Sequence, residues 1–254
     1  MIKSKKFSKI KDIEHGFFNS VGGQSKNIYK SLNCGLGSKD KKSDIKKNLQ
    51  IVKKKISKKA KNIFLLNQCH SNKFIHIDRE YKFNHKKKPK ADAIITNQKR
   101  LPIAILTADC APILIYESKI KMIAAIHAGW KGALKGIIKK VIKFMMKKGC
   151  EMENMTAVIG PTISLTNYEV KQDFKRKFIK KDKKNLIFFK INKNKLYFDL
   201  TKYIYSSLRN IKVKQIDILK IDTFDIKNKF FSARRALKLN HNDYGRNISI
   251  IMLN

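Results

Sequence analysis

The chain contains few cysteines, and no two of the four lie close together in the sequence (Cys34, Cys69, Cys110 and Cys150). Small secreted domains and structural zinc fingers use closely spaced cysteines, so neither class is indicated. Proline is as scarce, with four residues in 254, and no linker rich in proline, glycine or serine interrupts the sequence. We therefore expect residues 1–254 to form a single domain.

Membrane segments and nucleotide-binding motifs are also missing. No apolar run approaches the roughly 18 residues of a spanning helix, and the basic segment 1–11 lacks the apolar core of a signal peptide. Neither G-x-G-x-x-G nor a P-loop sequence occurs. We expect a cytoplasmic protein with reduced thiols, no membrane partner and no doubly wound Rossmann fold.

Acidic residues are rare, with 19 Asp and Glu against 58 Lys and Arg, which gives a net charge of +39. The basic residues are not concentrated in one segment, as they would be in a nucleic-acid-binding tail. A dispersed charge excess affects solubility and nonspecific association rather than fold. We expect the protein to favour anionic ligands and to bind nucleic acid only nonspecifically, in a salt-sensitive way. The sequence does not indicate an oligomeric state.

Short apolar runs and amphipathic helical patterns are mixed along the chain. The runs are rich in β-branched residues, which predicts strands, several of them buried on both faces. Apolar residues spaced by three and four predict helices. Because strands and helices do not alternate strictly, we predict an α+β fold with mixed β-sheets flanked by helices. The expected strands are 63–66, 74–77, 93–96, 103–106, 113–116, 122–126, 157–159, 186–189, 216–221 and 247–252, and the expected helices are 44–56, 134–145, 170–178 and 200–208.

Three of the expected strands lead into a strong metal ligand. His70 and Cys110 follow such strands, and His127 completes another. A catalytic zinc ion has three nitrogen, oxygen or sulfur ligands from the protein and leaves a fourth position for water or substrate. The long gaps between the three residues suit a catalytic site better than a structural one. His70, Cys110 and His127 are therefore the candidates to bind one zinc ion and to be catalytic. The alternative from spacing alone is that Cys110 is a core residue and that each histidine is a hydrogen-bonded structural group.

The neighbours of these residues have alternative interpretations. Asp109 is either a catalytic acid or base or a hydrogen-bonded turn carboxylate. Cys69 is expected to face away from the site, because adjacent side chains of an extended segment point in opposite directions. His15 is a further candidate for the same cleft. Trp130 either stacks on a base or lies buried beneath the helix that follows, whose N-terminus favours an anion.

Six motifs occur in an order that resembles a known family. Over about residues 12–253 the chain is similar to the YfiH-like family, also called the laccase-domain or multicopper polyphenol oxidoreductase family, of purine nucleoside phosphorylase type. The resemblance implies a YfiH-like fold and places the family's zinc ligands on His70, Cys110 and His127. The motifs are His15-Gly16-Phe17-Phe18 with Gly22-Gly23 and Ser31-Leu32-Asn33, Thr107-Ala108-Asp109-Cys110-Ala111-Pro112, His127-Ala128-Gly129-Trp130-Lys131-Gly132, Ile159-Gly160-Pro161, Tyr168-Glu169-Val170, and Phe230-Phe231-Ser232 with Arg234-Arg235 and Gly245-Arg246.

The resemblance implies a zinc-dependent purine nucleoside phosphorylase acting on adenosine, inosine, guanosine and S-methyl-5′-thioadenosine, with adenosine deaminase as a second activity. Lys131 is the candidate for holding phosphate, or else a solvated surface lysine. Arg234 and Arg235 hold substrate or are structural ion-pair partners. The family often has Gly where this chain has Ser71, and Arg before the Gly-Gly turn, where this chain reads Asn19-Ser20-Val21. If that arginine holds phosphate, another cation must replace it here.

Three alternatives stay open at this point. A copper polyphenol oxidase needs a larger set of histidines than the six dispersed ones present. A cysteine hydrolase would use Cys110 as nucleophile and His127 as base. An RNA-binding protein driven by charge would show steeply salt-dependent binding that survives Cys110→Ala.

Overall fold

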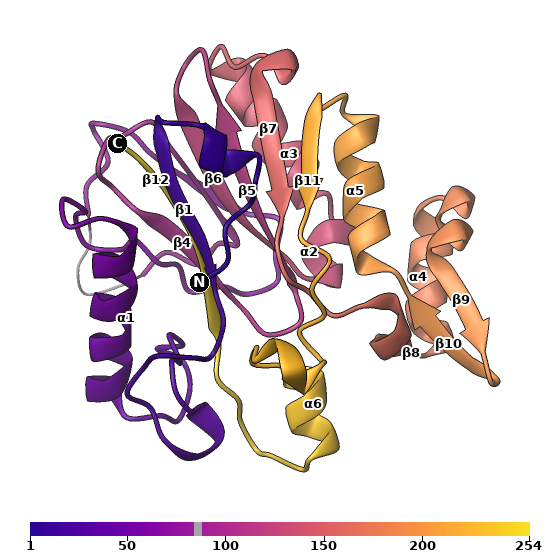
Figure 1. Ribbon diagram of the computed structural model, residues 1–254. Coiled ribbons are helices and arrows are strands. Elements are labelled where there is room, and N and C mark those ends of the chain that lie inside the picture. Colours follow the sequence, from indigo (N-terminus) through magenta and orange to yellow (C-terminus); the bar gives the residue numbers. More distant parts are fainter. Residues whose placement is uncertain (84–87) are drawn as a thin grey trace.

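The computed structural model describes residues 1–83 and 88–254 (Figure 1). Its mixed sheets and flanking helices confirm the predicted α+β class. The helices are α1 (Lys42–Ile56), α2 (Trp130–Leu134), α3 (Ile137–Lys147), α4 (Gln172–Lys181), α5 (Leu200–Asn210) and α6 (Ala233–Lys238). The strands are β1 (Ile13–Phe18), β2 (Phe74–Ile77), β3 (Ala93–Thr96), β4 (Ile103–Thr107), β5 (Ala111–Glu117), β6 (Met122–Ala128), β7 (Met155–Ile159), β8 (Glu169–Val170), β9 (Phe189–Asn192), β10 (Lys195–Phe198), β11 (Gln215–Ile218) and β12 (Asn247–Leu253).

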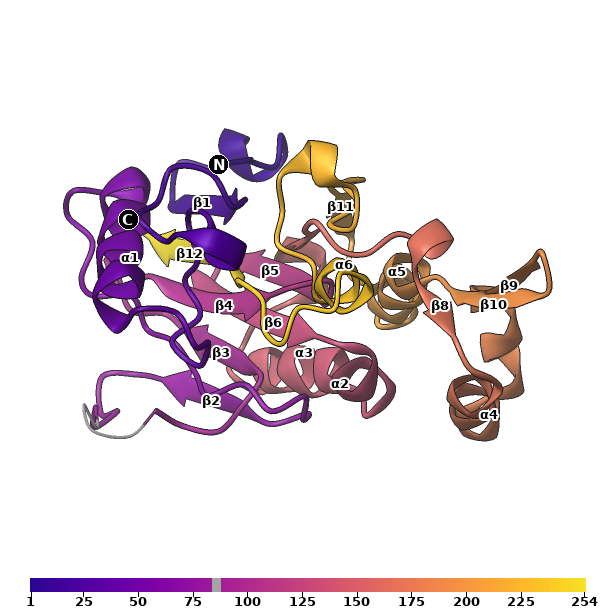
Figure 2. The same cartoon turned by 90° about the horizontal axis from the view of Figure 1, so that it is seen from below.

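The strands form three sheets. The largest has the order β11-β7-β5-β6-β3-β2, and its pairs are antiparallel except for β11 with β7 and β2 with β3. The sheet β1-β12-β4 is antiparallel and packs on one face of the large sheet. The small antiparallel sheet β8-β10-β9 projects with α4 at the end of the molecule far from α1 (Figure 2).

Successive side chains along a strand point to opposite faces of the sheet and so pack into two different layers of the core. On β5, Ile113 and Ile115 face the cluster formed with α3 and α5, whereas Leu114 and Tyr116 face the β1-β12-β4 sheet. The outer face of that second sheet is covered by α1. Because β5, β6, β7 and β12 are covered on both faces, every residue in them is buried. This burial explains their continuous apolar runs.

Three sequence predictions about elements were wrong. Residues 63–66 are not a strand, because only Phe64 makes a bridge, to Ile103 of β4. The strand expected over 186–189 is mostly replaced by a 3₁₀ helix over residues 183–188, before β9. The Asp182 side chain caps this helix by accepting a hydrogen bond from the Lys184 N–H. The helix expected over 134–145 is two helices, separated by Gly136 in the left-handed region at φ 78°, a conformation that favours glycine.

The remaining helices begin close to where the apolar spacing placed them, and Asp199 caps α5 by accepting a hydrogen bond from the Lys202 N–H. Val170 belongs to β8 rather than to the helix expected over 170–178, which starts at Gln172. Across residues 1–83 and 88–254, no helix is both long enough and apolar enough to span a bilayer.

One edge of the large sheet collects the ends of three strands. Strand β6 is antiparallel to both β3 and β5, with Ala93 opposite Ile126 and Ala111 opposite Ala128. The beginnings of β3 and β5 therefore lie beside the end of β6. The chain enters β5 directly from β4, so the linking turn 108–110 also lies at this edge.

Candidate metal centre

His70, Cys110 and His127 meet at this edge of the sheet. The ligand atoms that the three side chains offer all lie within 4.8 Å of one another. The Cys110 Sγ is 3.8 Å from the His70 Nε2, and the two imidazole rings have their centroids 4.8 Å apart. Ligand atoms bound to zinc at about 2.0–2.3 Å in a tetrahedron lie about 3.3–3.6 Å apart. The cluster therefore needs only small movements to hold one ion.

Asp92 holds two of the three ligands in place. This carboxylate is fully buried where the chain enters β3, and its Oδ1 lies 2.8 Å from the His127 Nδ1. It also accepts hydrogen bonds from the backbone N–H groups of Cys69, His70 and Ser71, and from the Ser71 hydroxyl. The contact with Nδ1 leaves the His127 Nε2 available as a ligand atom. Carboxylates that orient histidine ligands in this way raise metal affinity.

The loop that carries His70 is attached to the sheet by a side-chain amide. Gln68 Nε2 donates to the Leu106 carbonyl and Gln68 Oε1 accepts from the Leu106 N–H, each at 2.7 Å. This pair of bonds extends, through a side chain, the backbone pairing that Phe64 makes with β4. His70 itself has φ 57° in the left-handed region, a conformation that the hydrogen bonds from this loop to Asp92 stabilise.

The charges of the three central side chains are coupled. Burial opposes ionisation of the Cys110 thiol, but the positive charge of His127 and hydrogen bonds from both histidines lower its pKa to about 6. Burial likewise disfavours the His127 cation, but the Cys110 thiolate and Asp92 raise its pKa to about 9. Burial also opposes ionisation of Asp92, yet hydrogen bonds from His127 and Ser71 hold the pKa of that carboxyl well below its usual range. These interactions favour the thiolate form of Cys110, which is the form that binds a metal cation.

Gly129 gives the ligands room to approach. A Cβ at this position would lie 2.8 Å from the Cys110 Sγ and 2.9 Å from the His70 Cδ2. Both distances are shorter than side-chain contacts allow, so any larger residue must displace a ligand. The start of α2 at Trp130 thus packs directly against the cluster.

We expect Gly129→Ala to weaken metal binding by about ten- to a hundredfold, the range seen when groups that support metal ligands are displaced. Metal content after dialysis against a weak chelator would measure this loss. Gly37→Ala is the matched control, because nothing lies within 4 Å of its added Cβ. Equal metal content in the two variants would contradict the assignment of the site.

Asp109 is buried in the turn between β4 and β5, with φ 81°. Its carboxylate accepts hydrogen bonds from the hydroxyls of Thr223 and Ser232 and from the Arg234 N–H. Burial raises the pKa of Asp109, and these three bonds partly offset that effect. The carboxylate thus joins the Cys110 turn to the segment that begins α6, as the turn interpretation expects.

The three cations singled out in the sequence have different surroundings. Arg234 lines a cavity of about 170 Å³ together with Cys110, its guanidinium lies 5.4 Å from the Tyr168 ring centre, and its Nη1 donates to the Glu169 carbonyl. Arg235 donates to the backbone carbonyls of Thr223, Phe224 and Phe230. Lys131 is exposed, with its ammonium 5.6 Å from the Trp130 ring centre, and lines neither cavity beside Cys110.

Three other side chains considered for the site lie elsewhere or apart from the ligand group. His15 is buried under the N-terminal segment, where its Nε2 accepts a hydrogen bond from the Ser4 N–H, so its expected place in the cleft was wrong. Cys69 is exposed and does not belong to the ligand group, but its thiol donates to the Asp92 carboxylate at 3.5 Å, so the expectation that it faces away from the site was wrong. Trp130 packs against Phe174, with ring centres 4.8 Å apart, and links α2 to α4.

A second cavity, of about 300 Å³, opens on the other side of Cys110. Gly35, Gln68, Tyr244 and Arg246 line it together with all three proposed ligands. The Arg246 guanidinium lies 4.4 Å from the Tyr244 ring centre and donates to Asp243. Cys110 is therefore accessible from two cavities, each lined by an arginine beside a tyrosine.

Asp92 was missed in the sequence, although it left a signal there. It is a lone acid between Ala91 and the apolar run 93–96, and an acidic residue in such a setting is buried only if it is paired. Arg246 was noted only as part of a motif, and Tyr244 was not singled out. Nothing in their spacing from Cys110 shows that they line its cleft.

An α+β fold with a His-Cys-His group at the edge of its main sheet defines a protein with a candidate single-metal centre in a cleft. The chain belongs to the family described as multi-copper polyphenol oxidoreductase laccase, whose model matches residues 14–254.

Among relatives, a purine nucleoside phosphorylase of Rickettsia conorii is 36% identical over 192 residues, covering 75% of this chain and 77% of that protein. One of Bacteroides thetaiotaomicron is 29% identical over 245 residues, covering 92% and 91%. The crystal structure of a Neisseria meningitidis protein of family DUF152 superposes with a TM-score of 0.83 at 27% identity, covering 96% of each chain. That of Bacillus licheniformis YfiH gives 0.84 at 25% identity, covering 95% and 93%.

Proposed function

We propose that the protein is a zinc-dependent purine nucleoside phosphorylase. The observation that carries the proposal is the convergence of His70, Cys110 and His127, with ligand atoms within 4.8 Å, where two cavities meet. Relatives named purine nucleoside phosphorylase cover most of the chain at 29–36% identity, which supports the reaction class. We propose adenosine, inosine, guanosine and S-methyl-5′-thioadenosine as substrates.

The three ligands fit a zinc ion by their chemistry, because two imidazoles and one thiolate are among the ligand sets of catalytic zinc. When bound, the ion would supply a Lewis acid with an open coordination position. Asp92 holds a proton on the His127 Nδ1, which keeps the Nε2 directed to the site. Gly129 and Gln68 keep the ligands close together.

In the proposed reaction a phosphate oxygen attacks the ribose C1′ and the bond from C1′ to the base nitrogen breaks. The electron pair of that bond goes to the base, which takes up a proton, and the products are ribose 1-phosphate and the free base. We propose that Arg234, and Arg246 from the opposite side, hold the phosphate. We propose that the rings of Tyr168 and Tyr244 lie against the base or sugar.

The remaining predicted residues have defined places in this proposal. Lys131 is exposed and lies outside the two cavities. Its role in holding phosphate stays a prediction. Arg235 donates to three carbonyls, which favours a structural role over substrate binding. Asp109 accepts three hydrogen bonds, which favours positioning of the Cys110 turn over proton transfer.

The test is incubation of the purified protein with inosine or adenosine, with and without phosphate. We expect release of free base that requires phosphate, about one zinc ion per chain, and loss of base release in His127→Ala. Base release that persists in His127→Ala would come from a contaminating phosphorylase and would contradict the proposal. Release that does not require phosphate would indicate hydrolysis instead.

Adenosine deamination is the second activity that we propose. Zinc deaminases of nucleobases also bind one metal ion through histidine and cysteine ligands. Ammonia release from adenosine in phosphate-free buffer would test it in the same preparation. Copper polyphenol oxidation is less favoured, because residues 1–83 and 88–254 contain one group of three potential ligands, whereas multicopper oxidation needs a larger set.

A further inference from the structure

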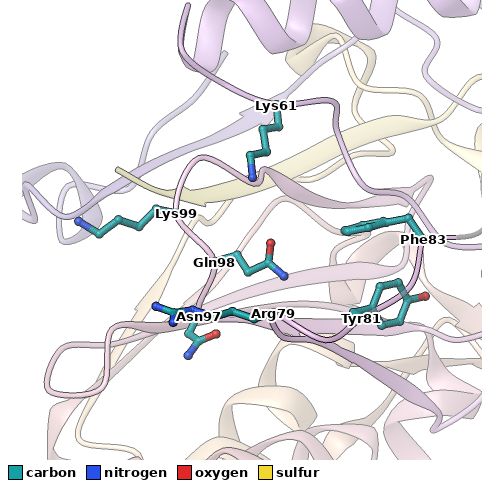
Figure 3. A pocket seen from close by; sticks show the side chains of 7 residues that line it. All are labelled: Lys61, Arg79, Tyr81, Phe83, Asn97, Gln98 and Lys99. Atoms are coloured by element: carbon teal, nitrogen blue, oxygen red, sulfur yellow. The ribbon is translucent and has the colours of Figure 1, made fainter.

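A cleft of about 670 Å³, separate from the two cavities beside Cys110, lies at the opposite end of β3 and β4 from the metal centre. Two aromatic rings, Tyr81 and Phe83, stand on one side of it, and the cationic ends of Arg79 and Lys99 on the other, while Lys61 reaches in from the segment after α1 (Figure 3). The amides of Asn97 and Gln98 complete its lining. We refer to these seven residues as the aromatic–cationic cleft.

The three segments that form this cleft are attached to one another. The Thr96 hydroxyl donates to the Ile77 carbonyl at 2.7 Å, and the Gln98 amide donates to the Asp78 carbonyl. The Lys61 N–H donates to the Arg100 carbonyl at 2.8 Å. These bonds fix the positions of the segments after β2, after β3 and after α1 relative to one another. The cleft is therefore formed without a ligand.

The rings and the cations are both available to a ligand. Phe83 is 42% exposed, and its edge-to-face contacts with Tyr81 and Phe64, at centroid distances of 5.1 and 5.7 Å, fix its orientation. In the part of the chain that the structure describes, no carboxylate lies within ion-pair distance of Lys61, Arg79 or Lys99. None of the described lining residues is acidic.

We propose that the aromatic–cationic cleft is a nucleotide-binding site, separate from the metal centre. A base would stack on Phe83 and Tyr81, and its phosphate would lie among Lys61, Arg79 and Lys99. Aromatic rings beside cations are the combination that binds single nucleotides and single strands, because every base has a π-face and every nucleotide carries a phosphate. Side-chain amides such as those of Asn97 and Gln98 can hydrogen-bond to base edges.

The size and place of the cleft agree with this occupant. Its volume lies within the range of about 300–1,000 Å³ that is common for small-molecule sites. Asp92 of the metal centre and Asn97 of the cleft lie at the two ends of β3, about 17 Å apart at roughly 3.3 Å per residue. A nucleoside at the metal centre therefore does not fill this cleft. A free nucleotide and a nucleotide of a single-stranded RNA present the same chemistry to it.

Calorimetric titration of the metal-loaded protein with AMP tests the proposal. We expect Phe83→Ala and Lys61→Gln each to weaken AMP binding by about tenfold while the rate of nucleoside phosphorolysis stays unchanged. The controls are Tyr205→Ala, which removes another exposed ring, and Lys180→Gln, which removes an exposed charge on α4 at the far end of the molecule (Figure 2). Both controls should bind AMP as the unmodified protein does.

Binding of a labelled single-stranded oligoadenylate and of a duplex RNA of equal length distinguishes the two candidate ligands, a free nucleotide and single-stranded RNA. Tighter binding of the single strand than of AMP would support the cleft as an RNA site. In that case the slope of the logarithm of the binding constant against the logarithm of the salt concentration should be smaller by about 0.7 in Lys61→Gln. Equal or weaker binding of the single strand would support it as a site for free nucleotides. AMP affinity that does not change in Phe83→Ala and Lys61→Gln would overturn the proposal. So would a loss in Lys180→Gln as large as that in Lys61→Gln, or duplex binding as tight as single-strand binding and insensitive to Phe83→Ala.

Discussion

Asp92→Ala is expected to lower the free energy of unfolding by about 3–5 kcal/mol, the cost of removing one partner from a buried charged pair, and to weaken metal binding by about ten- to a hundredfold. The reason is that this one carboxylate accepts hydrogen bonds from the loop of His70 and from the His127 ring. Without it, three part-buried backbone N–H groups and the buried His127 imidazole lose their partner. Urea unfolding and metal content per chain would measure the two effects.

Asp222→Ala is the control for this prediction. Asp222 also accepts several hydrogen bonds, from Ser164, Asn167 and Phe224, but it lies outside the ligand cluster. We expect this variant to lose stability and to keep its metal. If Asp92→Ala kept its full metal content while losing stability, Asp92 would have a structural role alone, and the positioning role assigned to it would be wrong.

Removal of the metal with a strong chelator should reduce the rate of phosphorolysis by about 10²–10⁴-fold, because Lewis-acid stabilisation of this kind contributes several kcal/mol. Addition of one equivalent of zinc should restore the rate. The same treatment separates this proposal from a cysteine hydrolase. In the metal-free protein the Cys110 thiol, whose pKa is lowered to about 6 by His127 and His70 against the effect of burial, should react faster with iodoacetamide near neutral pH.

Two outcomes would contradict the metal-dependent proposal. One is activity that is unchanged or higher after the chelator has removed the metal, since a thiolate nucleophile works without an ion. The other is equal alkylation of Cys110 in the zinc-loaded and metal-free protein, because a thiolate bound to metal is protected. Cys150 is buried and its pKa is raised to about 12 by burial, so it provides an internal unreactive reference.

The family description and the names of the relatives point to different chemistry. The matched family is described by copper and polyphenol oxidation, whereas the relatives are named for phosphorolysis of purine nucleosides. The cluster in this chain combines a thiolate with two imidazoles, and one such group occurs in the described residues. These residues offer one candidate single-metal centre, and the phosphate-dependent release of base described above tests the activity for which the relatives are named.

The sequence by itself determined the strands that are buried on both faces and singled out the three candidate ligands. Continuous apolar runs such as those of β5 and β6 are local signals, because burial on two faces excludes polar residues from the whole strand. His70, Cys110 and His127 could be selected because His70 and Cys110 come a few residues after an apolar run and His127 completes one. Their residue types alone favour zinc as the ion of this candidate site.

Only the tertiary structure decided which polar residues support those ligands. Asp92 acts on groups that are 21 to 35 residues away along the chain, and no periodicity connects them. Arg234 and Arg235 are neighbours in sequence, yet one faces the Cys110 cavity and the other donates to carbonyls of its own loop. The segment 63–66 pairs with β4 through Phe64 alone, and further along β4 the Gln68 side-chain amide, not the backbone of a strand, bonds to Leu106. Such choices depend on which donors and acceptors meet after folding, and the sequence records only that each is present.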